Sequence, residues 1–175
     1  MSILDWLRNA RPTDSAGHGD TDTVRRIVGE LDRVDPPLAR YLAAFAYVLS
    51  RVASADLGVS DVESEKMAEI IARLGHLPEE QAVLVVELAK TQNRLFGGTE
   101  NFLVAREFRA IATDDQRRQL LDCLFAVAAA DNEVSAEEEG QIRQIASELG
   151  FSHAEYVEAR MAYSDKRSVF RRERQ

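Results

Sequence analysis

Residues 52–75 read VASADLGVSDVESEKMAEIIARLG, and residues 127–150 read VAAADNEVSAEEEGQIRQIASELG. Ten of the 24 aligned positions are identical, at a constant offset of 75 residues. Each copy consists of the end of an apolar helix, a short turn and an amphipathic helix. Units of this kind bury their apolar faces against one another. The repeat therefore predicts a domain built on two related helical hairpins.

Helical periodicity continues through most of the remaining sequence. The sequence contains no sustained alternation of apolar and polar residues and no Asn-Gly hairpin turn, so strands are not expected. We predict an all-α fold, a compact helical bundle of about seven to eight helices. Gly75 and Gly150 each follow a leucine and are predicted to be left-handed C-terminal caps. A first helix begins near residue 22, and the others are expected at about 38–55, 61–74, 79–92, 100–112, 115–131, 136–149 and 153–164.

Four segments are predicted along the chain. Residues 1–10 form an amphipathic N-terminal arm around Trp6, and residues 11–22 have the polar, small-residue composition of a flexible linker. The helical domain spans residues 23–165. Residues 166–175 form a basic C-terminal tail, which is expected to be solvated or to fold back onto the acidic body.

The charge of the chain is strongly acidic and unevenly distributed. Its 175 residues include 22 lysines and arginines against 30 aspartates and glutamates, for a formal net charge of −8. Residues 166–175 hold five of the bases and one acid, so residues 1–165 carry 17 bases and 29 acids, a net −12. An acidic field of this kind excludes binding to nucleic acid through the overall charge. It favours cations or basic surfaces as partners.

The cysteine content and hydropathy indicate the compartment. With Cys123 alone, the chain forms no internal disulfide and no site with several thiolate ligands. No apolar run approaches the roughly 20 residues that cross a bilayer, and the N-terminus lacks the basic region of a signal peptide. We therefore predict a soluble, cytoplasmic protein.

Both turns of the repeat have the pattern Asp-x-x-Val-Ser-x-x-Glu. A serine followed three residues later by a glutamate is a capping box, which satisfies the first free N–H groups of a helix. Ser60 with Glu63 and Ser135 with Glu138 are predicted to form such boxes. A third box, Ser152 with Glu155, lies outside the repeated turns, so a box by itself can be purely structural.

Capping does not explain the repeated aspartates. Asp56 and Asp131 fall where an apolar helix ends, and a negative charge there is unfavourable by roughly 0.3–1 kcal/mol. A hard divalent cation, which takes carboxylate and carbonyl oxygens, would relieve this repulsion. A solvated acidic face with two good caps is the other interpretation, and both stay open. Neither turn is an EF-hand, because Asp61 and Ala136 stand where that loop requires glycine.

The stretches Ala55-Asp-Leu-Gly-Val-Ser-Asp-Val-Glu63 and Ala130-Asp-Asn-Glu-Val-Ser-Ala-Glu-Glu138 resemble the turns of the TerB-like tellurite-resistance domains. Those domains have two related helical hairpins with an Asp-Gly-x-[Val/Ile]-Ser-x-x-Glu turn. Here Leu57 and Asn132 stand where that pattern has glycine. The resemblance covers about residues 25–165. It implies an all-α domain that binds a metal, often calcium, in responses to tellurite or other chemical stress, with Asp56, Glu63, Asp131 and Glu138 as the metal ligands.

Catalytic motifs are missing from the sequence. His18, His76 and His153 belong to no HExxH or similar motif, and no glycine-rich phosphate loop is present. Cys123 lies in an apolar run and is predicted to be a buried core residue rather than a nucleophile. We predict that the protein is not an enzyme.

Two hypotheses for function follow. In the first, a divalent cation held by the acidic turns locks the hairpins together in a stress-response domain. In the second, the chain is an adaptor or scaffold that binds a basic protein partner through its acidic face without metal. The arm around Trp6 either docks in a groove between helices, which is the favoured interpretation, or docks on a second copy as a homodimer, or associates peripherally with a membrane. The basic tail is a second candidate for membrane-surface or nucleic-acid contact, although a nucleic-acid partner is not predicted for the protein.

Overall fold

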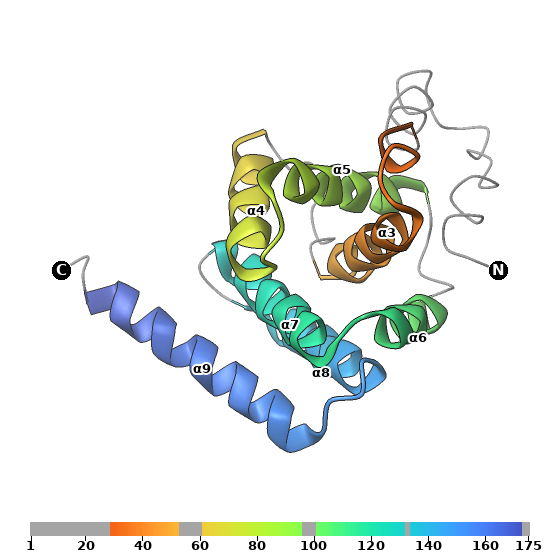
Figure 1. Cartoon of the computed structure of the whole chain (residues 1–175). Coiled ribbons are helices and arrows are strands. Elements are labelled where there is room, and N and C mark those ends of the chain that lie inside the picture. The colour runs from red at the N-terminus through yellow and green to blue at the C-terminus, as the bar shows by residue number, and fades with distance from the viewer. Residues whose placement is uncertain (1–28, 53–60, 96–100, 132–133, 173–175) are drawn as a thin grey trace.

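The computed structural model describes residues 29–52, 61–95, 101–131 and 134–172, and it describes only the backbone at 92–95, 101–102, 131 and 164–172. Within these ranges the regular elements are helices and no strand occurs, which confirms the predicted all-α fold (Figure 1). The elements are α3 (Pro36–Ser50), α4 (Asp61–Leu74), α5 (Glu79–Leu95), α6 (Asn101–Ile111), α7 (Asp114–Ala128), the 3₁₀ turn η2 (Ala129–Asp131), α8 (Ala136–Glu148) and α9 (His153–Arg172).

Helix α3 is the centre of one half of the core. Every residue from Tyr41 to Ser50 is buried, as its nearly uniform apolar composition predicts. The helix lies between α5 and α6 and packs against both (Figure 1). The rings of Tyr41 and Phe45 contact Phe108 of α6, with centroid separations of 5.4 and 6.1 Å. Aromatic contacts thus join the first hairpin to α6.

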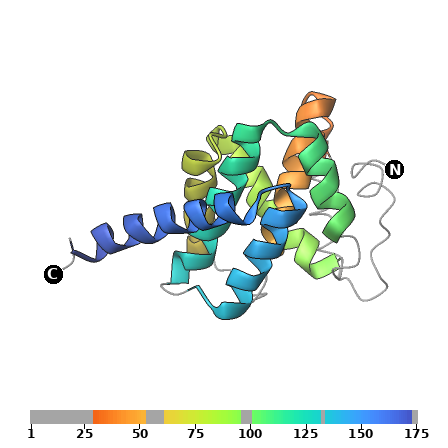
Figure 2. The ribbon, with the colours of Figure 1, turned by 90° about the horizontal axis from the view of Figure 1, so that it is seen from below.

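Helix α7 is the corresponding centre of the other half. Its residues Leu120, Leu121, Cys123 and Leu124 are completely buried. It packs against α4 of the first hairpin and against α8 and α9 (Figure 2). Contacts between α4 and α7 join the two hairpins.

The two predicted glycine caps have different outcomes. Gly150 has φ 91°, and the N–H groups of Gly150 and Phe151 donate to the carbonyls of Ser147 and Ala146 at 3.0 and 2.9 Å. These bonds make a Schellman motif and confirm the prediction at the end of α8. The prediction for Gly75 was wrong, because the left-handed residue at the end of α4 is His76, with φ 51°.

The backbone geometry at the end of α4 explains the glycine at position 75. Its N–H donates to the carbonyl of Ile71 at 2.8 Å, so Gly75 still belongs to the helical turn. A Cβ atom there would lie 2.6 Å from that carbonyl oxygen, 3.5 Å from Phe45 Cζ and 3.6 Å from Cys123 Sγ. The carbonyl of Ile71 therefore leaves no room for a Cβ atom, whereas Phe45 and Cys123 would be at ordinary van der Waals distance from it.

Helix α9 is longer than the predicted range of 153–164. It packs against α7 and α8 and continues to Arg172, so that its last turns stand away from the other helices (Figures 1 and 2). No glycine or proline follows Ser152, so nothing in the sequence stops the helix. The residues predicted as a basic tail are therefore helical from 166 to 172. In the described part of the chain, no helix combines the length and apolarity that crossing a membrane requires.

Candidate functional site

The first turn is only partly within the described residues. Asp56 and Ser60 lie outside them, and so does the predicted box between Ser60 and Glu63. Glu63 is exposed in the first turn of α4, next to Asp61. The predicted pairing of Asp56 with Glu63 stays a prediction.

The second turn contains the predicted capping box. Ser135 has extended backbone angles, and its hydroxyl accepts a hydrogen bond from the N–H of Glu138 at 3.2 Å. Oε2 of Glu138 accepts in return from the N–H and the hydroxyl of Ser135, at 2.8 and 2.7 Å. The box is therefore confirmed, and it uses only one oxygen of the Glu138 carboxylate. The other oxygen, Oε1, takes no part in it.

The end of α7 receives a lysine that the sequence did not predict. Helix α7 passes through η2 to Asp131, of which the structure describes the backbone. The Nζ atom of Lys66, on α4, donates a hydrogen bond to the carbonyl of Ala130 at 3.1 Å. The last carbonyls of a helix carry partial negative charge and lack partners within the helix. Lys66 therefore brings a positive charge to the residue immediately before Asp131.

The acid that precedes the third capping box also has a cation within the fold. Glu148 precedes Ser152 by four residues, as Asp131 precedes Ser135. Nη1 and Nη2 of Arg51, just after α3, donate to the two carboxylate oxygens of Glu148 at 2.5 and 3.3 Å. The side chains of the pair are only 5% and 9% exposed. This ion pair joins the end of α3 in the first hairpin to the end of α8 in the second.

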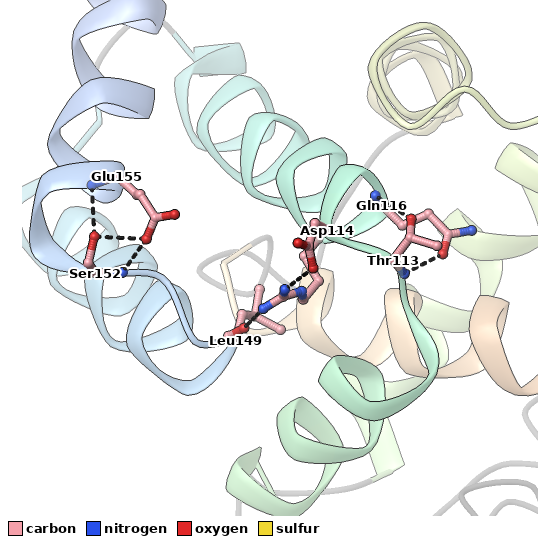
Figure 3. A network of polar contacts seen from close by, with 7 residues as sticks. Thr113, Asp114, Gln116, Leu149, Ser152 and Glu155 are labelled. Carbon is pink, nitrogen blue, oxygen red and sulfur yellow. Dashed lines mark hydrogen bonds and ion pairs between the residues drawn. The ribbon is translucent and has the colours of Figure 1, made fainter.

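The end of α8 shows the same arrangement once more. Nη1 of Arg117 donates to the carbonyl of Leu149 at 2.7 Å, and Nη2 pairs with Asp114 (Figure 3). The guanidinium group also lies over the ring of Phe151, 5.8 Å from its centroid. Figure 3 also contains a capping box that the sequence analysis missed, between Thr113 and Gln116 at the start of α7. Basic side chains from neighbouring helices thus meet the ends of both α7 and α8.

The second turn can accept a divalent cation only if the side chain of Lys66 moves. It offers oxygen donors of the type that hard cations take, namely the Ala130 carbonyl and Glu138 Oε1. Lys66 already donates to that carbonyl. Within the described residues no three histidine, cysteine, aspartate or glutamate side chains are grouped as metal ligands. A metal at this turn therefore requires the ammonium group of Lys66 to move away.

Most of the helical domain matches a known protein family. The family described as Tellurite resistance protein TerB matches residues 42–161, from within α3 into α9 and across both turns. The chain belongs to the TerB family. This confirms the resemblance that the repeated turns indicated. No curated protein and no solved structure gives a match to the chain.

In the described part of this TerB-family protein, the cysteine and the histidines lie in the core or at the ends of helices. Cys123 is completely buried, and burial followed by the charge of Asp122 raises the pKa of its thiol to about 12. It is a core residue, as predicted. His153 begins α9 with its ring stacked on Tyr156, and His76 adopts the left-handed turn. His18 lies outside the described residues.

Helix α4 of this TerB-family protein carries several exposed acidic side chains. Asp61, Glu63, Glu65 and Glu69 are all exposed along this helix. Val62 is exposed among them, with 74% of its surface accessible. Because opposite charges attract over about 10 Å at 0.1 M salt, this face suits a basic surface.

Proposed function

We propose that this TerB-family protein is a non-catalytic, cytoplasmic binding domain whose acidic turns take up a divalent cation, with calcium as the first candidate, in a response to tellurite or other chemical stress. The proposed ligands are Asp56 with Glu63 in the first turn and Asp131 with Glu138 in the second. The observation that supports the proposal is the hydrogen bond from Lys66 to the Ala130 carbonyl. It indicates that the carbonyl oxygen of Ala130, at the start of the second turn, accepts a positively charged group.

A calorimetric titration of chelator-treated protein with calcium tests this function. Thermal melts with calcium, magnesium and EDTA accompany it. We expect saturable heat and a higher melting temperature with the bound cation, because a ligand that binds only the folded state stabilises it. An absence of heat and of any shift in melting temperature would contradict the proposal.

Two matched variants test the assignment of residues. Glu138→Gln and Glu155→Gln each change the glutamate of a capping box, and both boxes have the same hydrogen bonds. The acid four residues before Ser152 is Glu148, which is bound to Arg51. Glu138→Gln should therefore lower calcium affinity, whereas Glu155→Gln should leave it unchanged. Equal affinities for the two variants would remove Glu138 from the ligand set.

A second candidate function is an adaptor that binds a basic protein partner without metal. The exposed acids of α4, with Val62 among them, favour it. Capture of a partner from cell extract should be unaffected by chelator. It should be lost when the salt concentration rises well above about 0.1 M, since ion pairing is then screened. Glu69→Lys on α4 should abolish capture, and Glu158→Lys on α9 is the charge-matched control. Capture that survives Glu69→Lys would contradict a role for this face.

The terminal segments have proposed roles of the same kind. The arm at residues 1–10 lies outside the described residues, so its docking in a groove, on a second copy or on a membrane surface stays a prediction. The basic residues of the tail, from position 166 onward, are on the projecting end of α9. Contact of this end with an acidic surface stays a prediction as well.

A further inference from the structure

The last turns of α9 leave the body of the fold as a continuous helix. The earlier part of α9 is held on α7 by Tyr156 and Tyr163, whose ring centroids both lie 5.9 Å from that of Phe125. The backbone then stays helical to Arg172, and both views show this end apart from the other helices (Figures 1 and 2). At 1.5 Å per residue, residues 164–172 extend about 13 Å beyond the last of these aromatic contacts.

The helical register predicts which residues continue the stripe that packs on α7. Tyr156 and Tyr163 are seven residues apart, which is close to two turns of a helix, and the next position in this register is Phe170. Lys166 and Arg167 follow Tyr163 by three and four residues and belong to the same stripe. On the projecting end, the stripe therefore consists of two bases and an aromatic residue. This composition suits an acidic surface that also exposes an apolar side chain.

Helix α4 has a surface of that complementary kind. Asp61, Glu65 and Glu69 are exposed at intervals of four residues, a spacing at which like charges repel one another. Within the described part of the chain, no lysine or arginine is paired with any of these three acids. Val62 lies beside them, with 74% of its surface accessible. An approaching basic surface would relieve the repulsion along α4 and cover its exposed valine.

The intact helix keeps these two surfaces of one molecule apart. The projecting end of α9 stands away from α4 of the same chain in both views (Figures 1 and 2). No glycine or proline follows Ser152, so the sequence provides no hinge at which α9 would fold back. Contact within one chain would require several helical turns to break. Contact between two molecules requires no change in either fold.

We propose that the projecting end of α9 docks on the acidic face of α4 in a second copy of this chain. The inference rests on the second candidate function, for which it names the partner, and it requires no metal. Opposite charges then face each other across the contact. A helix end of this length buries little area, so the association is weak and depends strongly on salt. Because the two surfaces differ, two copies exchange their ends in a closed dimer or continue into longer assemblies.

Reversal of the charges on either surface tests the pairing. The α4 variant is Glu65→Lys/Glu69→Lys, and the α9 variant is Lys166→Glu/Arg167→Glu. Sedimentation velocity compares them with the wild type over a range of protein concentrations, at low salt and in EDTA, and circular dichroism verifies that each variant is folded. We expect the wild type to associate reversibly. Each variant alone should have a dissociation constant raised at least about tenfold, because like charges then meet.

Exchange of the charges between the two surfaces provides the decisive control. In an equimolar mixture of the two variants, the reversed surfaces match each other and the unchanged surfaces also match, so association should return to the wild-type level. A chain with all four changes keeps the formal net charge of −8 and should also associate as the wild type does. A folded mixture that stays monomeric would overturn the inference, and so would wild-type association that persists in both variants.

The adaptor function and this inference can fail separately. A wild type that sediments as a monomer at every concentration would overturn the docking of a second copy. If such a monomer still captures a basic partner from cell extract, and Glu69→Lys abolishes that capture, the second candidate function stands while this inference fails.

Discussion

Replacement of Arg51 by methionine should destabilise the protein strongly, because it leaves the carboxylate of Glu148 buried without its cation. Two hydrogen bonds of 2.5 and 3.3 Å connect these side chains, and less than a tenth of either side chain is exposed. The pair bridges the end of α3 and the end of α8, so its loss acts on the junction of the two hairpins.

The burial of both partners sets the magnitude. Loss of one partner of a buried ion pair costs about 3–5 kcal/mol, because an uncompensated charge stays in a medium of low polarity. Domains unfold with about 5–15 kcal/mol in total, so Arg51→Met should remove a large share of the stability. For a chain of this length the change corresponds to a fall in melting temperature of roughly 10 °C. A surface ion pair would contribute less than about 1 kcal/mol.

Urea denaturation followed by far-ultraviolet circular dichroism measures the effect. The matched control is Arg40→Met, which breaks the 3.0 Å pair of Arg40 with Glu107, where the arginine side chain is 42% exposed. We expect that control to lose less than about 1 kcal/mol. The double variant Arg51→Met/Glu148→Met should recover most of the loss of the single variant, because the buried carboxylate of Glu148 is then removed as well. A loss for Arg51→Met no larger than that of the control would refute the reasoning, and so would a double variant less stable than the single one.

Three further predictions concern single positions. Gly150→Ala should lower the free energy of unfolding by about 1–2 kcal/mol because φ is 91° there, whereas Gly140→Ala, inside α8 with open space around it, should raise it by about 0.5–1 kcal/mol in the same denaturation assay. Iodoacetamide should label Cys123 only as fast as the protein unfolds, and rapid labelling of the native protein would contradict its burial. The hydrogen bonds of Ser152 lower the pKa of Glu155 below its ordinary 4.5, so the stabilisation is present above that value and is lost as pH falls through the lowered pKa. Glu155→Gln, which removes the charge that these bonds stabilise, should therefore lower the melting temperature most at neutral pH, and a deficit that does not shrink in acid would contradict this.

Local signals account for what the sequence predicted correctly. The all-α fold, the capping box of Ser135 and the left-handed Gly150 depend on residues within a few positions of one another, so the pattern contains them. Thr113 and Gln116 have the same kind of spacing, and a search for Thr-x-x-Gln would have found their box. The cap predicted at Gly75 was wrong because the left-handed residue is His76, while a Cβ atom at Gly75 would lie 2.6 Å from the carbonyl oxygen of Ile71.

The sequence analysis did not predict the ion pairs and hydrogen bonds between distant segments, because these contacts depend on how the helices pack. Arg51 and Glu148 are 97 residues apart, and Lys66 and Ala130 are 64 apart. Neither Arg51 nor Lys66 stands out from the other bases in the sequence, since their partners are determined by how α3, α4, α7 and α8 pack. The assignment of Asp56 and the first turn stays a prediction.

The sequence analysis left open what neutralises the acids that follow apolar helices, and an external cation was one of its two interpretations. In the described part of the chain, three bases from elsewhere in the fold serve two helix ends: Lys66 at the end of α7, and Arg117 and Arg51 at the end of α8, where Arg51 binds Glu148. Lysine and arginine groups at these helix ends meet the same electrostatic need that an external cation would meet. The acids that follow or end these helices therefore do not by themselves require a bound metal, and the assignment of one rests on a direct binding measurement.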